Sequence, residues 1–576
     1  MAYSASIQKI PRRLLPADFR LTDWASVSPY FDRLLQAEIG SLPELEDWLL
    51  QLSELEAAVS EDACWRQIRM TCDTENKSLE EAFAFYCNSI QPHVQAASDA
   101  LNRKLIHHPL TARLDAAQYH TYLRGIRKNI ELFREQNIPL QSELSVLEQQ
   151  FGAISGRMTV TVDGQVFTLQ QAAKFLEHED RNKREEVYRK INERRMQDSE
   201  PLHALFNQLC EKRMQVAINA GFDSYTDYRF RELGRFDYTA ADCQAFHEAV
   251  RSEVLPLVAD IYRRKRAKLG LEKLRPWDLE AEPPGTKPLR PFTGSDELID
   301  KTIRCFNKLR PFFGDCLSTM RGMRHLDLES RKGKAPGGYN CPLPESGAPF
   351  IFMNAAGQMQ DVVTMVHEGG HAVHSFLAHP LPLSGFKEYP MEIAEVASMS
   401  MELFSMAHWD VFFPDPAACR RARIHLLERI ITLFPWIALI DKFQHWIYAH
   451  PQHTDAQRSE TWMALLQEFS EGMVDFSGLD NYRANSWQKQ LHLFEVPFYY
   501  IEYGIAQLGA IGMWMQFKED REAALDNYCR ALSLGGTATL PELFRTAGLS
   551  FDFSADAIRK LMRFVREELE ALEASA

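Results

Sequence analysis

The spacing of hydrophobic and polar residues along the chain predicts a mainly helical protein. Apolar residues recur every three or four positions over most of its length, as in residues 44–59, which is typical of amphipathic helices. Residues 1–113 are predicted to form successive helices of this kind, and the pattern continues from Ala116 to Phe151. It returns from Gln170 to about Gln215, resumes again up to about Met323, and after Pro390 runs almost to the last residue.

Two short stretches carry strand signals instead. Residues 158–162 and 165–169 are rich in β-branched side chains and flank Asp163-Gly164, a dipeptide that favours a two-residue hairpin turn. Residues 349–353 are the second strand candidate. Since 576 residues exceed one ordinary core, we expect at least two lobes.

The segment 361–376 is the predicted helix with the most distinctive chemistry, His367-Glu-Gly-Gly-His371. Residues four apart share a helix face, so His367 and His371 can direct both imidazoles at one zinc ion. Glu368 projects about 100° further round, where a general base for metal-bound water belongs. Gly369 and Gly370 indicate that another backbone or a ligand comes close. A hydrogen-bonded pair of core histidines is the alternative.

A catalytic zinc site usually has three protein ligands, and spacing alone leaves the third one open. His374 shares the face but lies about 10.5 Å along the axis from His367, too far for one ion. The metzincin pattern requires His at 377, where the chain has Leu377, and the aminopeptidase pattern requires Glu at 390, where it has Pro390.

Four glutamates follow the motif on or near a helix that we expect to begin at the proline at 390. Glu392 and Glu395 lie one turn apart, so either can reach the metal while the other orients an imidazole. Glu388 and Glu402 are expected to lie at the surface.

Composition excludes several classes of function. The net charge of −14 argues against nucleic acid or an anionic membrane as partner. The longest apolar run, Ile430 to Ile440, is too short to span a bilayer, and residues 1–13 lack the apolar core of a signal peptide. The ten cysteines show no pairing pattern, so we expect ordinary buried thiols and a cytoplasmic protein. No oligomeric state is predicted.

The motifs together resemble a known family. The zinc-binding motif, followed by Glu395-Val-Ala-Ser398, is similar to the thimet oligopeptidase and oligoendopeptidase F family of zinc peptidases, family M3. Three further segments resemble its oligoendopeptidase F branch, namely Ala348–Asn354, Asp361–Thr364 and His492–Tyr503.

The resemblance implies a two-lobed helical zincin with thermolysin-like active-site helices around a deep channel. A small β element would lie beside the active site, and one β-hairpin in the N-terminal region. We expect three regions: an N-terminal helical region (1–113), a small helical lobe with the hairpin (114–195) and a catalytic domain (196–576).

By the same resemblance, one zinc ion per chain is bound by His367, His371 and Glu395, with Glu368 as the general base. His492 and Tyr503 would stabilise the transition state. Tyr500 would bind substrate, while Tyr499 is expected to be packing. The chain departs from the thimet pattern at Val496 and Pro497, where another tyrosine would stand.

The implied activity is that of a zinc metallo-endopeptidase acting on short unstructured oligopeptides. Residues 350–353, with Phe350 and Phe352, would bind the peptide as an added β-strand. A metallo-carboxypeptidase or dipeptidyl carboxypeptidase is the alternative enzyme, and a non-catalytic peptide-binding protein is the alternative outside enzymes.

Overall fold

A helical module occupies the N-terminal part of the chain. The computed structural model describes residues 3–7, 12–331, 333–335, 337–470 and 472–574, so part of the stretch inspected for a signal peptide lies outside them. The helices of this module are α1 (Trp24–Gln36), α2 (Leu42–Cys72), α3 (Lys77–Phe85), α4 (Gln91–His107) and α5 (Ala116–Leu132). Ser41 caps α2 by accepting a hydrogen bond from the backbone N–H of Glu44.

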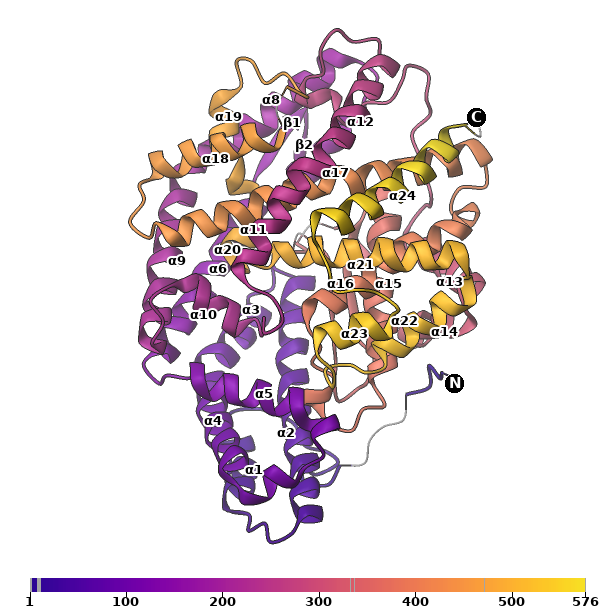
Figure 1. Cartoon of the computed structure of the whole chain (residues 1–576). Coiled ribbons are helices and arrows are strands. Elements are labelled where there is room, and N and C mark those ends of the chain that lie inside the picture. Colours follow the sequence, from indigo (N-terminus) through magenta and orange to yellow (C-terminus); the bar gives the residue numbers. More distant parts are fainter. Residues whose placement is uncertain (1–2, 8–11, 332, 336, 471, 575–576) are drawn as a thin grey trace.

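The core of this module extends past residue 113. Tyr119, Tyr122 and Ile126 on one face of α5 are buried in the same cluster as Trp48 of α2. Phe386, from much later in the chain, also enters this cluster and joins the module to the rest of the protein. Figure 1 shows the module as the indigo end of the molecule.

The next stretch contains the predicted hairpin. Its elements are α6 (Asn137–Gly156), β1 (Thr159–Val162), β2 (Gln165–Thr168), α7 (Leu169–Ala173), α8 (Arg181–Gln197), α9 (Ser199–Ala220), α10 (Tyr225–Glu232), α11 (Ala240–Ala249) and α12 (Leu255–Lys268). Asp163 and Gly164 have φ of 52° and 81°, as a hairpin turn of the predicted type requires. The helical pattern is interrupted between α5 and α6, because Pro139 is tolerated only in a first turn.

The remaining elements surround the motif His367-Glu-Gly-Gly-His371. They are α13 (Ser295–Leu309), α14 (Pro311–Met323), β3 (Leu326–Glu329), β4 (Tyr339–Cys341), β5 (Phe350–Ala355), α15 (Met359–Ala378), α16 (Met391–Ser405), α17 (Pro416–Ala449), α18 (Asp455–Ser470), α19 (Asp480–Ala484), α20 (Leu491–Glu495), α21 (Tyr500–Glu519), α22 (Arg521–Leu532), α23 (Leu540–Thr546) and α24 (Ala555–Ala574). The prediction of a mainly helical fold is confirmed.

The three-stranded sheet has the order β3-β5-β4. β5 pairs in parallel with β3 and antiparallel with β4, with Tyr339 opposite Phe352. The predicted strand therefore exists, but it is the central one. Its two edges are both occupied, whereas β4 has an edge that pairs with no described strand.

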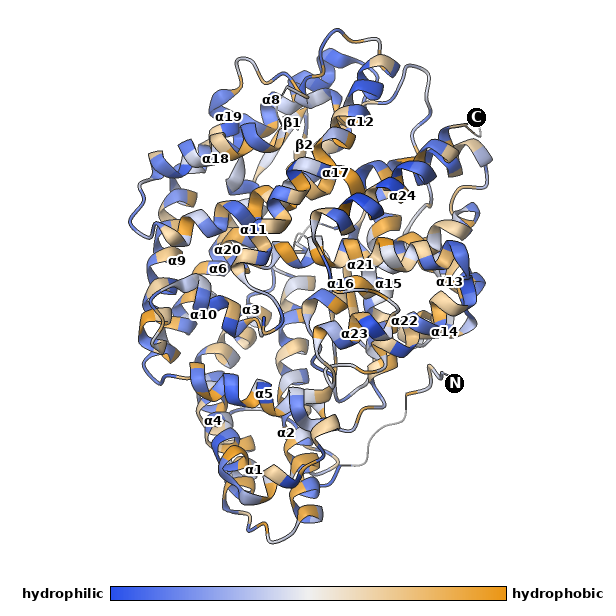
Figure 2. Ribbon diagram, in the orientation of Figure 1, coloured by the Kyte–Doolittle hydropathy of each residue, from blue (hydrophilic) through white to orange (hydrophobic). Residues whose placement is uncertain are grey.

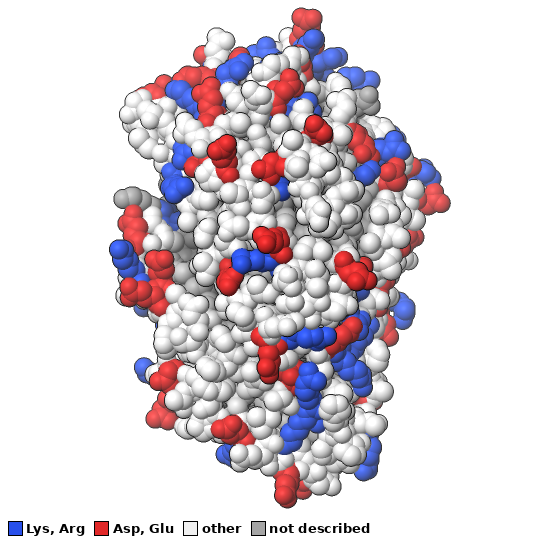
Figure 3. Space-filling view, turned by 90° about the vertical axis from the view of Figure 1, so that its left-hand side faces the viewer, with Lys and Arg blue, Asp and Glu red and all other residues white. Residues whose placement is uncertain are grey.

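Apolar residues gather on the central helices. Figure 2 shows hydrophobic colour concentrated where α16, α17 and α21 meet, and polar colour on outward faces such as that of α24. The apolar run 430–440 lies within α17, and Pro435 stands inside this helix. Among the described residues, no helix combines the length and apolar character needed to cross a membrane. Basic and acidic side chains are interspersed on the face in Figure 3.

Candidate functional site

The helix α15 presents the two motif histidines side by side. Asp361 stabilises its N-terminus by accepting hydrogen bonds from the backbone N–H groups of Ala356 and Gln358, at 2.7 and 2.8 Å. The rings of His367 and His371 are 4.9 Å apart. One turn of helix is therefore enough to bring two imidazoles to one point.

Two glycines let α15 approach its neighbours closely. A Cβ atom on Gly370 would lie 2.6 Å from the Cα atom of Ser398 in α16, and one on Gly369 would lie 2.7 Å from the ring of Phe306. Any larger residue at 370 would push the two helix backbones apart. The close approach predicted at the two glycines is therefore made by another backbone at 370 and by an aromatic ring at 369.

Close packing of α16 brings a carboxylate to the histidines. Oε2 of Glu395 lies 3.3 Å from Nε2 of His367 and 3.6 Å from Nε2 of His371. Ligand atoms of these three residues all lie within 4.8 Å of one another. Two imidazoles and one carboxylate are a donor set that suits zinc, so the residues present fit this ion.

Glu368 lies beside this triad with part of its carboxylate free of partners. Its side chain is buried, with the residue 6% exposed, and Oε2 accepts no hydrogen bond. An orphaned buried oxygen is costly unless a further group occupies the site. Burial raises the pKa of Glu368 to about 7.

The pKa values of two candidate ligands, His371 and Glu395, are both lowered. Burial lowers the pKa of His371 to about 4. Burial would raise the pKa of Glu395, but the charge of His371 and hydrogen bonds from His367 and Tyr499 lower it to about 2. A neutral imidazole and an ionised carboxylate are the forms that bind a metal.

Glu402 and Tyr499 hold the candidate ligands in place by hydrogen bonds, a role that the sequence analysis gave to neither of them. Nδ1 of His367 donates to Oε1 of Glu402 at 2.7 Å, although Glu402 was expected at the surface. The hydroxyl of Tyr499 donates to Oε1 of Glu395 at 2.7 Å, so this tyrosine is more than packing. Glu392 instead accepts from the hydroxyl of Tyr238, at 2.7 Å, and orients no imidazole.

Glu402 could have been recognised from its spacing. It follows Glu395 by two helical turns, so both carboxylates face α15. The third histidine of the region, His374, is fully buried and stacks on Tyr389 with ring centroids 3.6 Å apart. It is a packed residue rather than a metal ligand, in agreement with its distance along the helix from His367.

Comparison with known proteins decides the family. The family model described as Peptidase family M3 matches residues 174–563, and that of the Peptidase M3 N-terminal domain matches residues 16–133. The chain belongs to peptidase family M3. The resemblance to the oligoendopeptidase F branch is confirmed by the relatives and solved structures that follow.

Several M3 relatives match over part of their length. The chain is 23% identical over 332 residues to oligopeptidase PepF of Bacillus subtilis, covering 55% of this chain and 47% of that protein. It is 24% identical over 326 residues to group B oligopeptidase PepB of Streptococcus agalactiae, covering 55% and 52%. The matched region thus spans about half the length of these curated relatives.

Solved structures match almost the whole chain. A putative oligoendopeptidase F aligns with a TM-score of 0.91 at 26% identity, covering 96% of this chain and 98% of that one. PZ peptidase A, solved with an inhibitor, aligns with a TM-score of 0.91 at 24% identity, covering 96% and 98%. At 24% identity, the similarity to PZ peptidase A shows only that the two proteins share a fold.

His492 and Tyr503 belong to one network of hydrogen-bonded side chains in this M3 protein. The indole N–H of Trp436 donates to Oε1 of Gln490 at 3.1 Å, which turns the amide nitrogen of Gln490 toward Nδ1 of His492 at 2.7 Å. Nδ1 therefore accepts, and the proton of the neutral imidazole is on Nε2. Burial lowers the pKa of His492 to about 4, which keeps it neutral.

This tautomer determines what Tyr503 can do. Nε2 of His492 lies 3.3 Å from the hydroxyl oxygen of Tyr503 and donates to it, so the hydroxyl proton of Tyr503 remains available to another acceptor. The Tyr503 ring is 5.2 Å from that of Tyr499, which reaches Glu395. Tyr500 packs against His492 with ring centroids 4.8 Å apart. The sequence contains no local signal for Gln490 or Trp436.

Phe350 and Phe352 do not face the site, contrary to the sequence prediction. They are 5% and 0% exposed and pack in one cluster with Ile68 of α2. Because β5 is also the central strand, a peptide cannot pair with it. β4 borders α15, because the side-chain amide of Asn340 donates to the backbone oxygen of Glu368 at 3.2 Å. One edge of β4 pairs with no strand among the described residues.

Proposed function

We propose that the protein is a zinc-dependent endopeptidase that cleaves internal bonds of short, unstructured oligopeptides. Membership of family M3 supports peptide hydrolysis. The observation that carries the proposal is the convergence of His367, His371 and Glu395 within 4.8 Å, beside the partnerless oxygen of Glu368. All ten cysteines lie in the described part of the chain and are free, which supports a cytoplasmic location.

The chemistry divides between the ion and the side chains. A bound zinc ion would lower the pKa of water to about 7 and polarise the scissile carbonyl. Glu368 takes a proton from the attacking water and passes it to the leaving amine, a role that suits a carboxyl with a pKa of about 7. The hydroxyl of Tyr503 donates a hydrogen bond to the carbonyl oxygen, where negative charge develops, and His492 holds Tyr503 in place.

The substrate binds along β4 in this proposal. An extended peptide pairs with the open edge of Tyr339–Cys341 through backbone hydrogen bonds, so side-chain preferences are broad. A folded protein would have to unfold first, at a cost of about 5–15 kcal/mol. Substrates are therefore expected to be unstructured peptides rather than folded domains.

Digestion of one unstructured peptide, free and C-terminally amidated, tests the activity by mass spectrometry. We expect the same internal cleavage sites in both forms, loss of cleavage with a chelator and recovery with zinc, while native albumin resists. Stepwise loss from the C-terminus that amidation blocks would instead establish the carboxypeptidase alternative. No cleavage by the zinc-loaded protein would leave a peptide-binding protein.

A further inference from the structure

A second cluster of metal-ligating side chains lies on α11 and α17. Cys243 and His247 are four residues apart on α11, and Asp441 and His445 are four apart on α17, so each pair shares a helix face. Ligand atoms of Cys243, Asp441 and His445 all lie within 4.8 Å of one another. Within the described residues, this is the one such group besides the triad on α15 and α16.

The polar atoms of this cluster are incompletely satisfied. Asp441 is fully buried, and its Oδ2 accepts a hydrogen bond from Nε2 of His247 at 2.8 Å. Its Oδ1 is buried without a hydrogen-bond partner. Nε2 of His445 lies 3.3 Å from Oδ2 of Asp441, but it too is buried and makes no hydrogen bond of good geometry. A buried polar atom that nothing pairs with destabilises the folded protein. A bound cation would satisfy both atoms at once.

We propose that Cys243, Asp441 and His445 bind a second zinc ion, with His247 holding the carboxylate from behind. A thiolate and a carboxylate together neutralise a divalent cation, and sulfur, nitrogen and oxygen ligands are the set that zinc accepts. Tetrahedral zinc places its ligand atoms about 3.5 Å apart, so small side-chain rotations close the site. The side chain of His445 is 13% exposed and provides the route of entry.

The ion would be structural and would support the active-site tyrosines. The ring of His445 packs on Phe498 at 5.1 Å, and Phe498 has a strained φ of 65°. Gln444, beside His445, accepts from the backbone N–H of Phe498 at 2.5 Å. The next residue, Tyr499, donates to Glu395. The cluster therefore anchors the turn that precedes α21.

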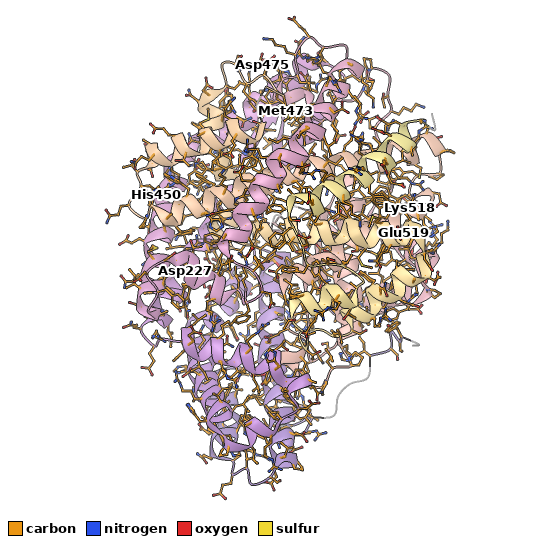
Figure 4. All side chains as sticks on the ribbon, viewed as in Figure 1. Asp227, His450, Met473, Asp475, Lys518 and Glu519 are labelled. Atoms are coloured by element: carbon orange, nitrogen blue, oxygen red, sulfur yellow. The ribbon has the colours of Figure 1, made fainter. Side chains whose placement is uncertain are left out.

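α17 packs against both α11 and α21. In Figure 4, His450 marks the end of α17 and Lys518 and Glu519 mark the end of α21, on opposite sides of the molecule. An ion between α11 and α17 would thus stabilise the start of α21, far from the end of α21 that Lys518 and Glu519 mark.

Zinc content per full-length chain, measured by plasma mass spectrometry, tests this site independently of the proposed activity. His371→Asn removes a ligand of the first site, so the zinc that this variant retains reports on the second one. We expect Cys243→Ser in this background to lose that zinc. Cys316→Ser is the matched control, because Cys316 is also a buried thiol but belongs to no ligand group. It should retain the zinc.

Cobalt provides a second measurement on protein that is already folded. Co²⁺ bound by the His371→Asn variant should give a thiolate-to-cobalt charge-transfer absorption that Cys243→Ser abolishes, and this spectrum decides alone if Cys243→Ser does not fold. A His371→Asn protein that takes up neither zinc nor cobalt would overturn the proposal. It would leave a hydrogen-bonded histidine–aspartate network.

Discussion

The two halves of the candidate active site differ in how the chain produces them. His367, Glu368 and His371 lie within five residues of α15, and the helical period alone puts them together. Their supporting residues come from elsewhere: Glu402 is 35 residues from the histidine it contacts, and Tyr499 is 104 residues from Glu395. The reacting groups are local, and the groups that hold them depend on how α15, α16 and α21 pack.

Glu368→Gln tests the local half and should have the largest effect. The amide cannot accept the proton of the attacking water, so we expect turnover to fall by about 10²–10⁴-fold. The fold and zinc content should not change, because no hydrogen bond to Oε2 is lost. Single-turnover kinetics together with zinc analysis measures both, and near-normal turnover by the zinc-loaded variant would remove Glu368 from the role of base.

Glu402→Ala tests the half that packing creates, with Glu392→Ala as its matched control. Loss of the partner of His367 Nδ1 should weaken zinc binding about 10–100-fold. Glu392→Ala, on the same helix, loses only a bond to Tyr238 and should bind zinc nearly as the wild type does. Competition with a fluorescent chelator gives both affinities. A larger loss of affinity in the Glu392 variant would reverse the two roles.

Gly370→Ala tests the junction between the halves, and the expected effect is the smallest. The added Cβ meets the backbone of Ser398 in α16, which cannot move aside without separating the helices, so we expect a loss of about 1–3 kcal/mol in unfolding free energy. Gly369→Ala meets the ring of Phe306, which can shift, and should cost less. Urea denaturation compares them, and equal stabilities would mean that the helix contact at 370 is not tight.

The sequence was sufficient to predict those features that depend on residues close together along the chain. Helical periodicity predicted α15, and the Asp163-Gly164 turn predicted the hairpin. The proposed ligand pair and base on α15 follow from the same periodicity. Each of these features depends on contacts between residues a few positions apart, which local spacing records.

Long-range contacts were decided only by the tertiary structure. Glu392 and Glu402 both lie on α16, and only its packing against α15 decides which carboxylate reaches His367. Strand order made β5 central and left β4 as the edge, which a strand signal cannot reveal. Cys243, expected to be an ordinary buried thiol, meets Asp441 only because α11 packs on α17. Distances between segments far apart in sequence depend on packing and side-chain volume, which no local pattern contains.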